Sequence, residues 1–321
     1  MAEHRVSVAT HGHCFDGLCS AVVFSRLVTA LRGDAPTFTY RACEYGAGDS
    51  AVPASALDGD DNAILDFRYT AVPTLTWYFD HHATAFRSDD DRARYDAGLP
   101  ANRFYEPAYT SCTKLIADVA RTRFGLAFPE LDDLVTWADR VDAAAFPDAE
   151  TAVVRRDPAL WLSTVTEHCS DDAFLARMVP RLLAQPLDEV ARSADVLERY
   201  APLAEKRAAA LELLRAHAEA RGSVAYCDLA DATPDVTEKF GLYALFPSCR
   251  YSVVVLRGPG RVKVGVGFNP WCGRPNVHHI GSICARHGGG GHPVVGALAL
   301  PLAEIDRARA IAASIAEELD G

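Results

Sequence analysis

The segment Leu75-Thr76-Trp77-Tyr78-Phe79-Asp80-His81-His82 joins a strand-like run to three polar side chains. Its first five residues are apolar, aromatic or β-branched, which predicts a buried strand. One carboxylate and two imidazoles follow directly, and ligands of open α/β sheets bind at the carboxyl ends of the strands. Because neighbouring side chains of an extended segment point to opposite sides, one histidine can bind a metal while the other faces a substrate.

Two further strand-like runs end in the same kinds of residue. Ala63-Ile64-Leu65 leads into Asp66, and residues 6–10 lead into His11-Gly12-His13-Cys14-Phe15-Asp16. A single buried strand that ends in aspartate usually marks a turn or a helix cap. Three runs that bring Asp and His to one edge of a sheet predict a metal cluster.

The order of these runs predicts an α/β fold with two domains. Strands separated by helical or loop segments favour a mostly parallel sheet flanked by helices. We expect this sheet in residues 1–186, a helical linker over residues 187–221, and a smaller α/β domain in residues 222–321. The other predicted strands are 38–43, 223–227, 251–256, 261–268 and 294–300, the predicted helices include 20–28, 110–124, 131–145 and 158–184, and residues 83–104 are expected to be an irregular surface excursion.

Charge and composition narrow the classes of partner. The chain of 321 residues has 32 Lys and Arg against 43 Asp and Glu, a net charge of −11. This balance argues against long nucleic acid as a partner, although a local basic pocket for a short phosphorylated ligand remains open. The nine cysteines form no Cys-x-x-Cys pair, which favours reduced thiols. With no signal-peptide pattern and no apolar run near about 18 residues, we expect a cytoplasmic protein without a membrane partner. The oligomeric state stays open, and a homodimer is one alternative.

The predicted helix over residues 131–145 carries two aspartates on one face. Asp139 and Asp142 lie three residues apart, so their side chains are neighbours. Both can be solvated helix charges, and for Asp142 we leave that reading open. Asp139, which lies among Trp137, Ala138 and Val141, is the better candidate for a carboxylate that points inward.

A run of four glycines, residues 288–291, precedes His292 and Pro293. The run is either a flexible loop or a backbone that must approach a ligand closely. We favour a cradle for a phosphate or carboxylate, in which bare N–H groups face the anion and His292 adds a donor. It is not a nucleotide P-loop, because no Lys-Ser or Lys-Thr follows the glycines.

Together these motifs resemble the DHH phosphoesterase superfamily, in particular its members with a DHH and a DHHA1 domain. Residues 11–21 resemble the first motif, Asp66 the second, residues 80–82 the third and Asp139 the fourth, while residues 288–293 resemble the DHHA1 signature. The resemblance covers nearly the whole chain. The superfamily includes nanoRNases, 3′-phosphoadenosine-5′-phosphate phosphatases, cyclic dinucleotide phosphodiesterases, RecJ-type exonucleases and polyphosphatases, and its members typically use two Mn²⁺ ions.

The resemblance implies a role for each candidate residue. Asp66 would bridge two ions, Asp80 would orient the histidine beside it, and His82 would face the phosphate as a catalytic group. The remaining metal ligands would be His11, His13 and Asp16 on the first ion and His81 and Asp139 on the second. Gly289, Gly290, Gly291 and His292 would hold a terminal phosphate of the substrate.

Two positions depart from the family pattern. Cys14 stands where the family usually has an aspartate, and an imidazole or thiolate there favours softer ions such as Zn²⁺ or Fe²⁺ over Mn²⁺ at the first site. The strand over residues 265–268 lacks the arginine that related DHHA1 domains use to grip substrate. Asn269, Arg274 or Arg286 would have to replace it.

The function implied by the resemblance is a metal-dependent phosphoesterase. It would hydrolyse phosphodiester or phosphomonoester bonds of small nucleotides or short oligonucleotides by a metal-activated water. Two alternatives stay open: a polyphosphatase or pyrophosphatase, and a non-catalytic nucleotide sensor.

Overall fold

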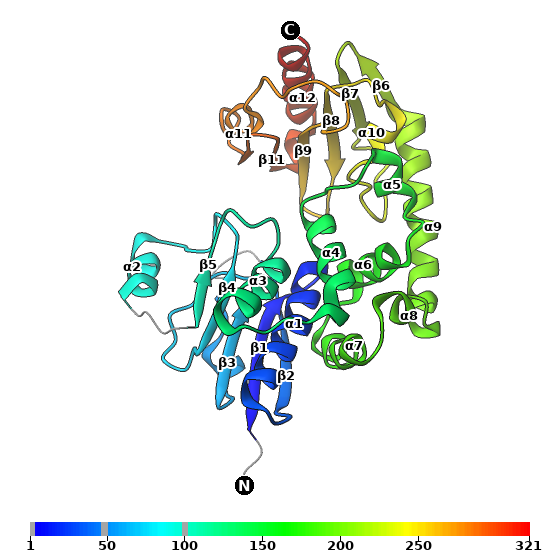
Figure 1. Ribbon diagram of the computed structural model, residues 1–321. Helices are drawn as coiled ribbons and strands as arrows, with labels where there is room; N and C mark the ends of the chain where they lie inside the picture. The colour runs from blue at the N-terminus through cyan, green and yellow to red at the C-terminus, as the bar shows by residue number, and fades with distance from the viewer. Residues whose placement is uncertain (1–3, 46–50, 98–101) are drawn as a thin grey trace. The chain divides into compact units, whose positions relative to one another are not determined.

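The computed structural model describes residues 4–45, 51–97 and 102–321, which form two compact units (Figure 1). The first unit contains the chain up to Ala145 and Asp157–Tyr200, and the second contains Phe146–Arg156 and Ala201–Gly321. Each unit has its own sheet. The long helix α9 (Ala194–His217) contributes residues to both units.

The sheet of the first unit is entirely parallel, which confirms the predicted fold class. Its strand order is β2-β1-β3-β4-β5, and each neighbouring pair is parallel. The carboxyl ends of all five strands therefore lie at one edge, as the site predicted from the sequence requires. The strands are β1 (Arg5–His11), β2 (Thr37–Cys43), β3 (Asp61–Leu65), β4 (Trp77–Asp80) and β5 (Arg103–Tyr105).

Helix α1 (Phe15–Arg32) is the central helix of this unit and is buried along most of its length. It contacts β1 and β3 of the sheet and also four helices, α3 (Cys112–Phe124), α4 (Asp132–Asp142), α6 (Pro158–Cys169) and α7 (Asp172–Ala184). A helix surrounded in this way is buried on nearly all sides, which explains why most of its residues from Leu18 to Val28 are apolar. Helix α8 (Leu187–Ala191) also belongs to this unit.

The side chains of β4 alternate between the two faces of the sheet and pack into the hydrophobic core on each face. Trp77 and Phe79 point to one face, where their rings lie 5.7 and 6.2 Å from that of Phe24 in α1. Tyr78 points to the other face, where its ring lies 5.3 Å from that of Tyr69. A strand buried on both faces reads as a continuous apolar run, as this stretch does in the sequence.

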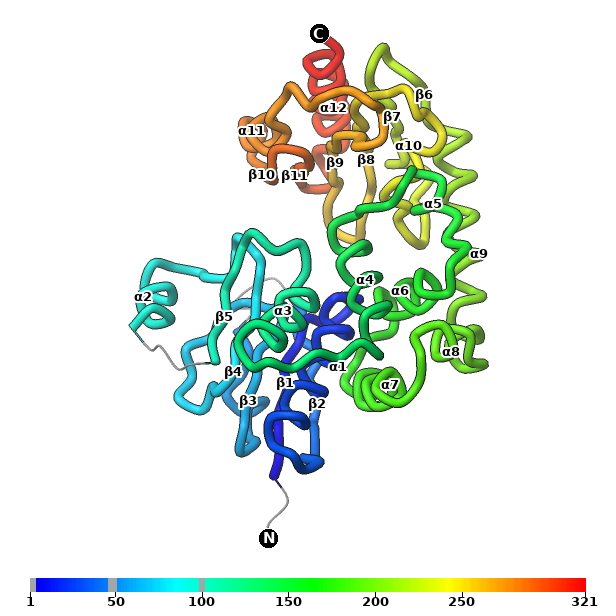
Figure 2. Tube along the Cα trace, in the orientation of Figure 1, coloured from blue at the N-terminus to red at the C-terminus, as the bar shows by residue number. Residues whose placement is uncertain are grey.

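The second unit contains a mixed six-stranded sheet of order β10-β11-β9-β8-β7-β6 (Figure 2). Only β7 and β8 are parallel neighbours. Helices α11 (Ile280–Ala285) and α12 (Ile305–Asp320) share one hydrophobic core with this sheet, whereas Leu214 of α9 and Leu242 of α10 (Gly241–Leu245) belong to another. The strands are β6 (Ala218–Arg221), β7 (Val224–Leu229), β8 (Tyr251–Arg257), β9 (Arg261–Phe268), β10 (Gly290–His292) and β11 (Val295–Pro301).

Three segments differ from the sequence-based expectation. The presumed excursion contains α2 (Asp89–Ala97), whose three aspartates in the first turn suit the positive end of a helix dipole. The segment 158–184 breaks into α6 and α7, because Asp171 caps α7 by accepting a hydrogen bond from Phe174 N. The segment 187–221 ends in strand β6, and Gly222, with φ of 57°, turns the chain into β7. Among the helices that the structure describes, none is both long and apolar enough to cross a membrane.

Candidate metal centre

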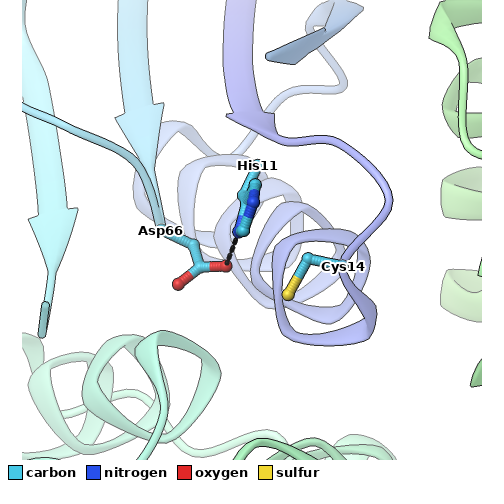
Figure 3. A group of neighbouring side chains, drawn as sticks. All are labelled: His11, Cys14 and Asp66. Carbon is cyan, nitrogen blue, oxygen red and sulfur yellow. Dashed lines mark ion pairs between the residues drawn. The ribbon is translucent and has the colours of Figure 1, made fainter. Parts of the chain in front are cut away.

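Three neighbouring strands deliver polar side chains to one point at the carboxyl edge of the parallel sheet. His11 is the last residue of β1, Asp66 follows β3, and His81 and His82 follow β4. Asp66 has φ of 54°, in the left-handed region that aspartate tolerates better than most residues. Its N–H still donates to Phe79 O at 2.9 Å, so the chain turns sharply while it stays bonded to β4. Figure 3 shows the side chains of His11 and Asp66 facing each other at this edge.

Asp66 is fully buried at the middle of the site. Its Oδ2 lies 3.5 Å from His11 Nδ1, and its Oδ1 lies 3.5 Å from His81 Nε2. Within the described chain, these four buried atoms have no hydrogen-bond partner. Buried polar atoms are nearly always paired, so four unpaired donors and acceptors that face one another fit a set of metal ligands.

Among the residues that the structure describes, three groups of side chains have possible metal-ligand atoms within 4.8 Å of one another. Asp66 belongs to two of these groups and His81 to two, so the groups form one continuous cluster. Carboxylate, imidazole and thiolate are all ligands of divalent transition metals. The groups are His11, Cys14 and Asp66; Asp66, His81 and His82; and Asp16, His81 and Asp142.

Asp16 is fixed by the amino end of α3. Its two carboxylate oxygens accept hydrogen bonds from Cys112 N at 2.7 Å and from Thr113 N at 3.0 Å. These N–H groups have no partner inside the helix, so the carboxylate caps them. Asp16 Oδ2 also lies 3.8 Å from His81 Nε2, and the same nitrogen lies 3.4 Å from Asp142 Oδ2.

Hydrogen bonds orient the two histidines differently. His81 Nδ1 lies 3.1 Å from Tyr109 O, so it carries the proton there and leaves Nε2 for the carboxylates. His82 Nδ1 donates to Asp80 Oδ1 at 2.7 Å. The buried Asp80 also accepts from the Tyr78 hydroxyl at 3.0 Å, which holds its carboxylate in place. Because Nδ1 of His82 is committed to Asp80, Nε2 is the ring nitrogen left to meet a metal or a substrate.

The crowded carboxylates perturb one another. Burial, and after it the charge of Asp66, raises the pKa of Asp16 well above its usual range and the pKa of Asp142 to about 6. Burial lowers the pKa of His81, but Asp66 and the other two carboxylates outweigh it and raise that pKa to about 9. Burial alone would raise the pKa of Asp66, but the imidazoles of His11 and His81 outweigh burial and lower this pKa. Protons thus offset part of the negative charge, a role that divalent cations can take over.

Solved structures with the same fold exist, although no protein-family model and no curated protein matches the chain. The pGpG-specific phosphodiesterase PggH from Vibrio cholerae superposes with a TM-score of 0.69 at 20% identity, over 99% of this chain and 100% of that one. The DHH domain of a member of a family of ribosomal proteins gives 0.60 at 16% identity, over 99% and 88%. RecJ from Thermus thermophilus with Mn²⁺ gives 0.57 at 13% identity, over 98% of this chain and 52% of RecJ.

The chain has the fold of these three proteins. This confirms, at the level of the fold, the resemblance seen in the sequence. Four of the predicted ligands, His11, Asp16, Asp66 and His81, come together at the carboxyl edge of the DHH sheet.

Asp139 does not join them. Its carboxylate accepts hydrogen bonds from Thr110, from Ser111 Oγ at 3.1 Å and from Lys114 Nζ at 3.1 Å. It lines a cavity of about 280 Å³ between α1, α3 and α4, and none of the clustered ligands lines that cavity. The residue of α4 that reaches His81 is Asp142, the last in the helix. The apolar neighbours that favoured Asp139 are therefore a poor guide, because the site lies beyond the end of α4 rather than beneath its apolar side.

His13 also lies outside the cluster. Its Nε2 lies 3.0 Å from Glu44 Oε1 and its Nδ1 lies 3.2 Å from Glu167 O, and its side chain is 41% exposed. Cys14, which we did not count among the ligands, faces His11 and Asp66 instead (Figure 3). His13 has φ of 54°, so the chain turns there, and Cys14 rather than His13 lies beside Asp66.

The glycine run has a packing reason that the sequence did not reveal. Gly290–His292 forms the edge strand β10. A Cβ on Gly289 would lie 2.2 Å from Ala297 O, and one on Gly291 would lie 2.2 Å from Val295 O. Close backbone contact with β11 therefore accounts for these glycines. Phosphate binding by the run and by His292 stays a prediction.

Asn269 and Arg286, the expected substitutes for the missing arginine, are engaged elsewhere. The buried Asn269 side chain donates to Cys249 O at 2.9 Å and accepts from Trp271 N at 3.0 Å. Arg286 bonds both carboxylate oxygens of Glu318 at 2.5 Å. These contacts weigh against a substrate role for either residue.

Proposed function

We propose that this protein is a metal-dependent phosphoesterase that hydrolyses small nucleotides or short oligonucleotides. The observation that carries the proposal is the position of Asp66, whose two unpaired oxygens face ligands on either side. A carboxylate placed in this way can bridge two ions. The similarity in fold to a dinucleotide phosphodiesterase over the whole of both chains supports this substrate class.

The residues divide into two half-sites around Asp66. His11 and Cys14 would hold one ion, and Asp16, His81 and Asp142 would hold the other. Divalent ions held by these residues would supply a water of lowered pKa and would neutralise charge on the phosphoryl oxygens. We propose Mn²⁺ for the second half-site, because its carboxylates are hard donors, and the RecJ structure of the same fold was solved with Mn²⁺.

His82 is the candidate proton donor. Burial lowers the pKa of His82, but the hydrogen bond to Asp80 and the charge of Asp66 outweigh it and raise that pKa. A histidine that keeps its proton near neutral pH can donate it from Nε2 to the leaving oxygen. Asp80 would hold the ring in the orientation that this transfer needs.

Arg68 offers a positive charge beside the cluster. Its Cζ lies 4.7 Å from the centre of the Tyr45 ring, and that ring lies 4.9 Å from the His11 ring. The buried Arg68 Nε has no hydrogen-bond partner in the part of the chain that the structure describes. An arginine beside a metal cluster whose Nε can still donate a hydrogen bond is suited to bind a phosphate of the substrate.

A substrate panel tests this function. Purified protein with Mn²⁺ should hydrolyse a dinucleotide and a 5′-phosphorylated dinucleotide faster than pyrophosphate or polyphosphate. We also propose that the protein does not process long nucleic acid, because its net charge of −11 opposes binding to a long polyanion. A cytoplasmic location is a further part of the proposal. Preference for polyphosphate would favour the polyphosphatase, and tight nucleotide binding without hydrolysis would favour the sensor.

A further inference from the structure

Cys14 lies directly before helix α1 and beside the candidate metal ligands. It precedes α1 in an extended conformation, at the helix cap position where Ser, Thr, Asp or Asn usually bonds the first turn. The Cys14 side chain makes no hydrogen bond of capping geometry, although an interaction with the backbone of Gly17 in the first turn favours its thiolate. Its sulfur instead points toward the side chains of His11 and Asp66 (Figure 3).

The atoms that surround this sulfur are those of a metal site. His11 Nδ1 and both Asp66 oxygens are buried without hydrogen-bond partners among the residues the structure describes. Sulfur, nitrogen and oxygen donors from three side chains leave a fourth tetrahedral position for solvent or substrate, as in catalytic zinc sites. Burial and the charge of Asp66 raise the pKa of the Cys14 thiol, so the thiol keeps its proton until a cation displaces it.

The two half-sites therefore differ in chemical hardness. Asp16, Asp142 and His81 offer two carboxylates and one imidazole, whereas Cys14 and His11 replace hard oxygen by sulfur and nitrogen. Thiolate ligands select borderline-soft ions, and carboxylates suit Mn²⁺ or Mg²⁺. Asp66 is common to both sides.

We propose that Cys14 is a metal ligand and that its half-site selects a borderline-soft ion of the Zn²⁺, Fe²⁺ or Co²⁺ class, which makes the centre a mixed-metal one. The proposal rests on the proposed function only in placing a metal at this cluster. Binding forms one sulfur–metal bond and releases the thiol proton to solvent. The contrasting view is a cysteine that only fills space, as the fully buried Cys19 of α1 does.

Absorption spectroscopy with Co²⁺ separates these views without an activity assay. Metal-free protein titrated with Co²⁺ should develop the near-ultraviolet charge-transfer band of a thiolate–cobalt bond. The band should be lost in Cys14→Ser and kept in Cys19→Ala, the matched control. Cys14→Asp should also lose the band but still bind the ion, with Zn²⁺ affinity lowered relative to Mn²⁺ by about tenfold or more. Circular dichroism checks that each variant is folded.

The proposal is overturned if wild type binds Co²⁺ without the band, if the band survives in Cys14→Ser, or if no Co²⁺ binds. Its failure is distinguishable from that of the proposed function. If the cobalt–thiolate band appears but the protein hydrolyses no nucleotide, Cys14 is a metal ligand and the proposed phosphoesterase activity is refuted. If the protein hydrolyses nucleotides with Mn²⁺ but shows no such band, the proposed activity is supported and the role of Cys14 as a metal ligand is refuted.

Discussion

Asp66 Oδ1 and His81 Nε2 lie 3.5 Å apart, and both are buried without a hydrogen-bond partner among the described residues. Two ligands of one ion, each about 2.0–2.2 Å from it, are separated by roughly 3–3.5 Å. The separation of the pair therefore fits two ligands of one ion. Chain segments 15 residues apart in sequence meet here because β3 and β4 are parallel neighbours.

Helix α4 carries a matched pair of aspartates for testing the ligand set. Asp142→Ala should lower kcat/KM by at least about 100-fold, because it removes a candidate ligand from beside His81. Asp139→Ala should leave kcat/KM within a few-fold of wild type and cost about 1–2 kcal/mol of folding free energy from its lost hydrogen bonds. Steady-state kinetics and urea unfolding measure both. The opposite ranking of the two variants would restore Asp139 as the ligand.

The metal-free protein should lose stability as the pH rises from about 6.5 to about 9. Asp66 and the other carboxylates raise the pKa of His81 from 6.5 to about 9, so the folded protein binds this proton more tightly than the unfolded chain. The stabilisation is complete below pH 6.5 and is lost as the pH passes through about 9, with a change of up to about 3 kcal/mol.

Urea unfolding with a chelator at several pH values measures the slope of the unfolding free energy against pH. His81→Gln should flatten it, and saturating Mn²⁺ should do the same, because a bound cation replaces the proton. An equal slope in wild type and His81→Gln would rule out the cluster as its source.

Asp80 should control the proton of His82. His82→Gln is expected to lower kcat by about 10²–10⁴-fold, the usual contribution of a general acid. Asp80→Asn removes the charge that raises the pKa of His82. The alkaline limb of its pH–rate profile should therefore move to lower pH, in contrast to a general loss of structure, which would lower the rate at every pH.

Arg68 should contribute to substrate affinity. Arg68→Met is expected to raise KM for a dinucleotide by about 10-fold or more, since a hydrogen bond to a charged group contributes about 1.5–3 kcal/mol. Arg26→Met is the matched control, because Arg26 also lies 4.7 Å from an aromatic ring, that of Phe128, but pairs with Glu130 at 2.9 Å. Equal KM values for the two variants would show that Arg68 only packs on Tyr45.

Much of the first unit could be predicted from its sequence. Asp66 and His81 each follow a buried apolar run, and parallel strands leave only one edge where such residues can meet. Their spacing in the sequence is enough to place them together, and the structure does so.

Other residues could not be placed in this way. Asp139 and Asp142 lie on one side of the same helix, and only the position of the helix end relative to His81 distinguishes them. His13 and Cys14 are separated by a turn conformation, φ of 54° at His13, that composition does not reveal. The glycine run reads like an anion cradle, but the backbone contacts of Gly289 and Gly291 arise from strand pairing that only the structure shows.

Metal stoichiometry tests the shared-carboxylate centre most directly. Wild type and Asp66→Ala would be equilibrated with Mn²⁺ and Zn²⁺ together, freed of excess ions and assayed for total metal, with Asp139→Ala as the control. We predict two divalent ions per chain in wild type and in the control, and at most one in Asp66→Ala. Two ions retained by Asp66→Ala, or none bound by wild type, would contradict a centre built around Asp66.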